Sequence, residues 1–187
     1  LYCVSGSSEF KLAGEKYQNR FYRNDDKGRF TLDTSALPEI TSSGSFVIAN
    51  DFDQDGDLDL LVGGRVKPMR YPESPESYIL INDGTGKFEN KTASYSKELS
   101  NIGMVTAAIW TDVNNDGWAD LAIVGEWMPI TFFINVEGKS FTRQEVAGTS
   151  GWWNSIAGGD FDNDGDIDYV AGNLGLNSIY KASAEEP

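Results

Sequence analysis

Three short acidic segments are the part of the sequence whose residue types and spacing fit a defined chemistry. They follow the pattern D-x-[DN]-x-D-G-x-x-D and begin at Asp51, Asp112 and Asp160. They hold 13 of the 29 Asp and Glu residues of a chain whose net charge is −14. Carboxylates at alternate positions of a tight loop converge on one point, and Ca²⁺ binds hard oxygen ligands of this kind. The sequence therefore predicts three calcium sites.

The expected ligands are the side chains at the first, third, fifth and ninth positions of each loop and the backbone carbonyl at the seventh. A glycine at the sixth position (Gly56, Gly117 and Gly165) allows the backbone to turn sharply. The predicted ligand residues are Asp51, Asp53, Asp55, Asp57 and Asp59 in the first loop, Asp112, Asn114, Asp116, Trp118 and Asp120 in the second, and Asp160, Asp162, Asp164, Asp166 and Asp168 in the third.

Three other interpretations of these loops are weaker. An EF-hand also requires a Glu at the twelfth position and a helix on each side. The twelfth residues here are Val62, Ile123 and Ala171, and the flanking residues show no helical period. Metal-free acidic turns would leave close carboxylate pairs that repel by roughly 3–4 kcal/mol each at an effective dielectric near 20. Mg²⁺ prefers stricter octahedral geometry and fewer protein ligands, so calcium is the expected ion.

The segments that position the loops read as β-hairpins. Each loop lies between two apolar runs, and a second element, in which an Asn precedes a Phe by six positions, occurs at residues 21–30, 79–88 and 132–141. An apolar strand, a turn of Asn, Asp or Gly and a strand opened by an aromatic residue indicate a hairpin. Four antiparallel strands in a repeat of about 50 residues are typical of a propeller blade. The predicted fold class is an all-β propeller of four-stranded antiparallel blades.

We expect residues 1–187 to form part of one propeller domain. The predicted division is a partial blade over 1–37, blades over 45–92 and 105–146, and a partial blade over 154–187. The first blade lacks its opening strand and acidic loop, and residues 173–180 only begin the next strand. The chain would thus hold about three to three and a half blades of a larger propeller, since closure needs at least about four.

Composition excludes several function classes. The negative charge argues against nucleic acid as a partner. No run of about 18 apolar residues is present, so no membrane-spanning helix is expected. The chain has no His and one Cys, and no nucleophile lies beside a base, so we expect no enzyme activity. The lone Cys3, in an apolar strand, is expected to be a small buried residue.

The acidic loops and their apolar flanks resemble the FG-GAP (VCBS-type) repeats of integrin α-subunit propellers and of many bacterial surface proteins. The resemblance covers essentially the whole chain. It is greatest for bacterial VCBS-repeat proteins related to cartilage acidic protein, through the segments Tyr17-Gln-Asn-Arg-Phe-Tyr-Arg-Asn24, Gly63-Gly-Arg-Val-Lys-Pro68, Gly125-Glu-Trp-Met-Pro129 and Gly151-Trp-Trp-Asn-Ser-Ile156.

This resemblance implies a propeller that is typically seven-bladed, with the calcium loops together on one face. It also implies an exported protein, at the cell surface, outer-membrane associated or periplasmic in a Gram-negative bacterium. Extracellular calcium modules bind near 10⁻⁴–10⁻³ M, whereas cytosolic free calcium is too low to fill such sites. Membership of an outer-membrane surface complex is compatible with this location.

A few residues outside the loops are candidates for contact with a ligand. Trp152 and Trp153 are expected in a loop before a first strand, where they either pack between blades or stack on a sugar or a partner. Trp127 is open to the same two interpretations. Arg65, Lys67, Arg70 and Tyr71 belong to a Pro-rich connection, a usual place for binding residues.

The leading functional hypothesis is a non-catalytic, calcium-stabilised propeller that serves as a platform for a protein or ligand partner. The alternative is a carbohydrate-binding accessory propeller of a glycan-uptake complex or of a polysaccharide-active enzyme. A third interpretation, a catalytic propeller, would need residues beyond those of this chain.

Overall fold

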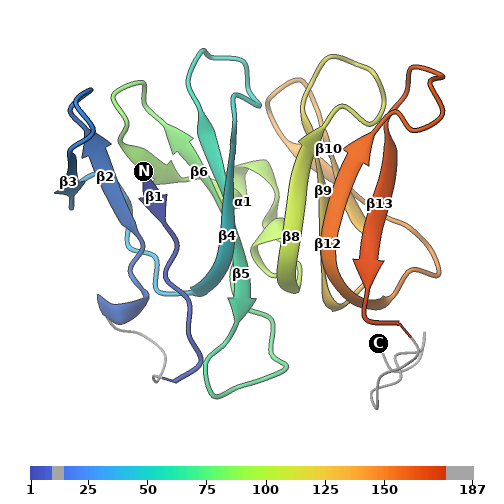
Figure 1. Cartoon of the computed structure of the whole chain (residues 1–187), viewed down its shortest axis with the longest axis horizontal. Coiled ribbons are helices and arrows are strands. Elements are labelled where there is room, and N and C mark those ends of the chain that lie inside the picture. Colours follow the sequence, from blue (N-terminus) through green and yellow to red (C-terminus); the bar gives the residue numbers. More distant parts are fainter. Residues whose placement is uncertain (10–14, 176–187) are drawn as a thin grey trace.

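The computed structural model describes residues 1–9 and 15–175, and these form antiparallel β-sheets that stand side by side (Figure 1). The all-β fold class predicted from the sequence is confirmed. The sheets lie like neighbouring blades, with the strands running between two ends of the molecule (Figure 1). Helical structure in the described residues is limited to the short segments η1 (Glu15–Tyr17), α1 (Thr92–Tyr95) and α2 (Lys97–Ser100).

The strands follow one another in the order of the predicted repeat. The first sheet has three strands, β1 (Tyr2–Cys3), β2 (Arg20–Asn24) and β3 (Phe30–Asp33). The second has four, β4 (Ser43–Asn50), β5 (Asp59–Val66), β6 (Tyr78–Asn82) and β7 (Phe88–Asn90). The third contains β8 (Met104–Thr111), β9 (Asp120–Met128), β10 (Thr131–Asn135) and β11 (Phe141–Glu145), joined by β12 (Gly151–Gly159) and β13 (Asp168–Asn173).

Strand β12 belongs to two sets of pairings. Its first residues pair with the end of β9, with Gly151 opposite Met128 and Trp152 opposite Glu126. The rest of β12 pairs antiparallel with β13 as far as Gly159. The chain therefore passes from one blade-like unit to the next within a continuous strand.

The core lies between the sheets, because the second strands β5 and β9 are buried on both faces. Successive side chains of a strand point to opposite faces. In β5, Leu61 packs toward the third sheet, whereas Leu60 and Val62 pack toward the first. In β9, Ile123 and Val124 divide in the same way between two clusters. Burial on both faces explains the continuous apolar runs that follow the first two acidic loops.

Two details differ from the sequence analysis. Trp152 and Trp153 lie inside strand β12 rather than in a loop before it, because the pairing with β9 extends the strand toward its start. Cys3 is half-buried rather than buried, on the short strand β1. The division into blades at 1–37, 45–92, 105–146 and 154–187 stays a prediction. Its parts over 10–14 and 176–187, which include most of the segment 173–180 expected to begin the next strand, lie outside the described residues.

Candidate calcium centre

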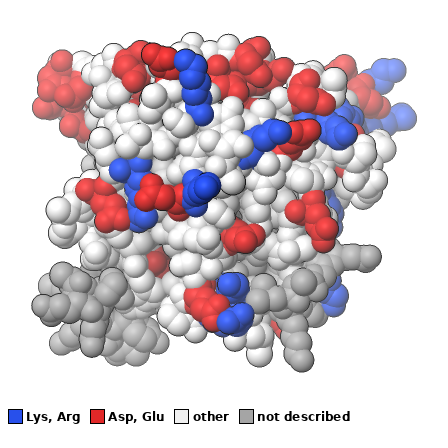
Figure 2. Space-filling model, turned by 180° about the vertical axis from the view of Figure 1, so that it is seen from behind, with Lys and Arg blue, Asp and Glu red and all other residues white. Residues whose placement is uncertain are grey.

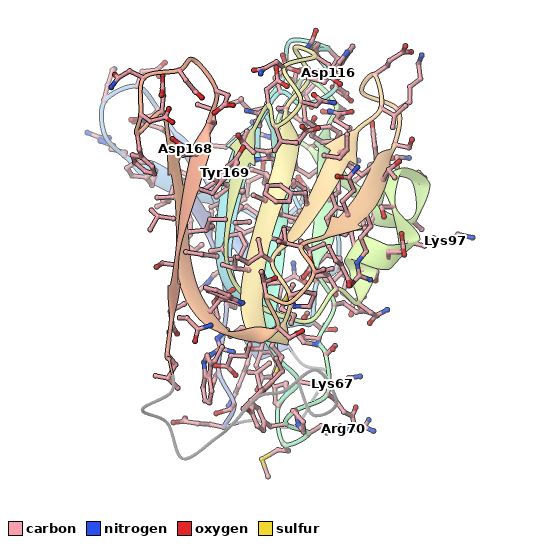
Figure 3. All side chains as sticks on the ribbon, turned by 90° about the vertical axis from the view of Figure 1, so that its right-hand side faces the viewer. Lys67, Arg70, Lys97, Asp116, Asp168 and Tyr169 are labelled. Atoms are coloured by element: carbon pink, nitrogen blue, oxygen red, sulfur yellow. The ribbon has the colours of Figure 1, made fainter. Side chains whose placement is uncertain are left out.

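The three acidic loops connect the first two strands of successive hairpins, β4–β5, β8–β9 and β12–β13. All three lie at the same end of the molecule, at the top of Figure 1. Asp116 and Asp168 are near this end in Figure 3, far from Lys67 and Arg70 at the opposite end. Strands flank every loop, so the EF-hand interpretation fails in the structure as it did in the sequence.

The backbone follows one path in all three loops. The fourth residue has a positive φ in each, with values of 58° at Gln54, 55° at Asn115 and 64° at Asn163. The glycine at the sixth position has a φ between 86° and 98°, a region that favours glycine. The first Asp of each loop accepts a hydrogen bond from the N–H of this glycine, at 2.8–3.1 Å. The turn thus holds the first carboxylate inside the loop.

The first loop contains the most crowded carboxylates. Asp51, Asp53 and Asp55 each place an oxygen within 4.8 Å of those of the other two. Among the described residues, no hydrogen-bond partner reaches the buried Oδ1 atoms of Asp51 and Asp53 or Oδ2 of Asp59. Buried polar atoms are normally paired, so these three oxygens leave room for a cation.

The electrostatics of the first loop also favour a cation. Asp59 is fully buried, and this burial, with further contributions from the neighbouring acidic side chains, raises its pKa to about 7. A hydrogen bond from the N–H of Asn82 opposes the shift without cancelling it. Burial likewise raises the pKa of Asp53. A carboxyl with a raised pKa is one whose charged form lacks compensation, which a divalent ion would supply.

The third loop resembles the first, and the second is different. In the third loop Asp160, Asp162 and Asp168 gather within 4.8 Å of one another. Repulsion from Asp164 raises the pKa of Asp166. In the second loop, where Asn114 replaces an Asp, the amide of Asn114 donates a hydrogen bond of 2.8 Å to Asp116. Burial raises the pKa of Asp120 there, so this carboxyl has the same unmet need for positive charge.

The backbone carbonyls predicted as ligands belong to the residue at the seventh position of each loop. The N–H group of that residue is already hydrogen-bonded within the loop. The N–H of Asp57, Trp118 and Asp166 each donates to the carboxylate of the fifth residue, at 2.8–3.1 Å. These bonds hold the residues whose carbonyls are the predicted ligands. The assignment of the fifteen ligand residues stays a prediction.

Two asparagines donate hydrogen bonds to the last Asp of a loop. Their repetition is visible in the sequence, but these hydrogen bonds are not. The N–H of Asn82 donates to Asp59 at 2.9 Å, and the N–H of Asn135 donates to Asp120 at 2.6 Å. Their side-chain amides donate to the carbonyl of the residue before that Asp. The constant spacing of six positions before a Phe was the signal for this role.

Neighbouring loops are also bonded to each other. The buried amide of Asn135 donates to the carbonyl of Phe52 in the first loop at 2.8 Å, and to Ala119 in the second at 3.0 Å. The side chain of Gln54 donates to Gly117 at 2.9 Å. The hydroxyl of Tyr95 donates to Asp53 at 3.1 Å. A substitution that moves one of the first two loops therefore also disturbs hydrogen bonds of the other.

The surface charge agrees with this concentration of ligands. Figure 2 shows red acidic side chains gathered along the upper rim of the molecule, at the end where the loops lie. Close carboxylates on one rim repel one another unless cations are bound. The donor set, the unpaired oxygens and the raised pKa values all fit Ca²⁺.

The other residues predicted to contact a ligand meet near the opposite end. Arg65 forms an ion pair with Glu126, and the indole N–H of Trp127 donates to the hydroxyl of Tyr71 at 2.6 Å. Trp127 also packs on Trp152, with ring centroids 5.1 Å apart. Trp153 instead packs against the cluster between β9 and β12. Lys67 and Arg70 form ion pairs with Glu73 in the same connection.

A family model described as FG-GAP-like repeat matches residues 6–62 and 112–171, more than half of the chain. The chain belongs to the FG-GAP-like repeat family. The two matched stretches contain all three acidic loops and most of their flanking strands. FG-GAP-like repeats build β-propeller interaction modules that are generally non-catalytic, often bind calcium and are typical of extracellular proteins. No curated protein matches the chain.

Proposed function

We propose that this FG-GAP-like chain is a non-catalytic, calcium-stabilised β-propeller module that serves as an interaction platform on an exported bacterial protein. The observation that supports it most is the first loop, where buried oxygens of Asp51, Asp53 and Asp59 have no hydrogen-bond partner among the described residues. Such oxygens are costly unless a cation is bound.

The ion would be held in each loop by the carboxylates and the carbonyl named above, with Asn114 replacing one carboxylate in the second loop. Calcium supplies positive charge where acidic side chains are forced together. Free calcium a hundredfold above the Kd of a loop would stabilise the fold by about 2.7 kcal/mol per site. Because Gln54 and Asn135 connect the loops, this stabilisation would extend to the contacts between sheets.

The end opposite the loops is the surface we assign to the partner. There the connection between β5 and β6 and the starts of β4 and β12 bring polar, charged and aromatic side chains together. The partner would be a protein or a glycan. The described residues include no helix that is long and apolar enough to cross a membrane.

Thermal melts with and without calcium test the stabilising role. We expect removal of calcium with excess EGTA to lower Tm by roughly 5–10 °C for each loop that loses its ion. Anomalous scattering from crystals grown in calcium should show an ion in each of the three loops. An unchanged Tm in EGTA, together with no ion at the loops, would refute the proposal.

A further inference from the structure

A cavity of about 610 Å³ lies between the sheets at the end opposite the acidic loops. Its walls include Ser43 at the start of β4, Arg65 near the end of β5, Glu126 in β9 and Trp152 in β12. Ser7, after β1, and Tyr71, in the connection between β5 and β6, complete it. Ligand pockets commonly measure about 300–1,000 Å³. Segments from three sheets thus enclose a volume that suits a small ligand.

The charged groups in the wall form one balanced pair. Glu126 is only 4% exposed, and a terminal nitrogen of Arg65 donates to its Oε1. In the described parts of the chain, the other guanidinium N–H groups of Arg65 have no acceptor. The pair therefore offers donors and an acceptor side by side while its net charge is zero. Glu126 would repel an anion and Arg65 would repel a cation, so a neutral hydrogen-bonding ligand is favoured.

Aromatic rings form the other part of the wall. Tyr71 is 54% exposed, and its hydroxyl accepts from the indole of Trp127, which leaves its own O–H to donate. Trp127 packs in turn on Trp152. These rings present flat apolar faces beside the polar pair, which suits a ring that is apolar on its faces and polar at its edge.

The backbone at Trp127 is strained in a way that serves this arrangement. Its φ is +59°, a left-handed value that bulky residues rarely adopt. The pairing between β9 and β12 is irregular at the same place. Strain of this kind persists only where the surrounding structure holds it, and it gathers at functional sites. Here it accompanies the contact of the indole with both Tyr71 and Trp152.

We propose that this cavity binds a neutral saccharide, with the Arg65–Glu126 pair hydrogen-bonded to adjacent sugar hydroxyls and the rings of Tyr71 and Trp152 against the sugar face. Donors and acceptors that alternate around a pyranose match the guanidinium and carboxylate edges. The inference rests on the proposed interaction function and gives that function a ligand class.

Isothermal titration calorimetry of the whole chain in calcium, with maltohexaose, cellohexaose, xylohexaose, mannohexaose and laminarihexaose as probes, tests the proposal. We expect at least one of them to bind with a Kd between about 10 μM and 1 mM. Tyr71→Ala, at an exposed position in a connection, should weaken that binding roughly tenfold. Phe30→Ala removes an equally exposed ring far from the cavity and should leave binding unchanged.

A second substitution, Trp152→Ala, should weaken binding at least as much as Tyr71→Ala. The proposal is overturned if none of the five hexasaccharides binds, or if binding survives both substitutions undiminished. Binding of a fully sulfated heparin hexasaccharide or of a peptide library in place of every neutral probe also overturns it. A calcium-dependent Tm measured on the same sample separates these outcomes, because it would persist if only the saccharide assignment were wrong.

Discussion

Replacing Asp59 by Asn should change stability in opposite directions with and without calcium. Asp59 is fully buried, its Oδ1 accepts from Asn82, and its Oδ2 has no partner among the described residues. Asn has nearly the same shape but no charge. Asn therefore does not repel the nearby carboxylates of Asp53, Asp55 and Asp51, as the charged Asp59 does. The substitution therefore removes a predicted calcium ligand and, in the same step, a buried negative charge.

The size of the effect follows from the pKa of Asp59, which is about 7 in the folded chain against a usual value of 3.8. Because the folded state holds this proton more tightly, the contribution of Asp59 to the stability of the metal-free fold is fully present below about pH 4 and is lost as the pH rises through about 7. Above that window the charged Asp59 costs on the order of 4 kcal/mol. In EGTA at pH 8, Asp59→Asn should recover much of this cost.

Urea unfolding followed by tryptophan fluorescence measures the free energy of unfolding both in EGTA and in calcium. In EGTA at pH 8 we expect Asp59→Asn to raise the free energy of unfolding by a few kcal/mol. In millimolar calcium it should lower that free energy by about 2.7 kcal/mol, the contribution of one filled site. Asp83→Asn is the matched control, because Asp83 lies in an exposed turn and its carboxylate holds only Thr85 and Lys87. Equal destabilisation by Asp59→Asn in both buffers would refute the reasoning.

Three further experiments test other parts of the structure. In calcium, Asp53→Ala should lower the free energy of unfolding by about 2–3 kcal/mol, whereas Asp83→Ala should lower it by less than about 0.5 kcal/mol. Urea unfolding measures both changes, and equal losses would contradict the ligand assignment. Asn135→Ala should lower the free energy of unfolding by about 2–3 kcal/mol and weaken terbium binding at the first and second loops. Weaker terbium binding at only one of these loops would contradict the link between them. Gly64→Ala places a Cβ 2.3 Å from the carbonyl oxygen of Glu76 and should lower Tm by destabilising the fold by about 1–3 kcal/mol. An unchanged Tm would show that the connection before β6 can move away from β5.

The sequence predicts the hairpins well because two local signals coincide in them. Gly56, Gly117 and Gly165 adopt the positive φ that the turn requires, and the apolar runs after the first two loops become strands buried on both faces. Turn-forming residues and the pattern of apolar residues act over a few positions, so they can be recognised in the sequence without knowledge of the tertiary structure. For the same reason the position of the loops between paired strands follows from the sequence.

Contacts between distant segments are not legible in this way. The ion pair of Arg65 with Glu126 and the hydrogen bond of Trp127 to Tyr71 join residues more than fifty positions apart. The placement of Trp152 inside β12 depends on pairing with β9, a contact that no local pattern encodes. The short helices α1 and α2 arise in a connection whose sequence has too few residues to show a helical period.

The double pairing of β12 has a mechanical consequence. Because β12 pairs with β9 at its start and with β13 along the rest of its length, tension along the chain reaches the pairing at Gly151 and Trp152 directly. Pulling β12 and β13 away from β9 would have to break that pairing, whereas pulling the second and third sheets apart would have to break the contact of Gln54 with Gly117. The described sheets would therefore resist stretching at two separated points, and an ion bound as proposed in the first two loops would strengthen one of them.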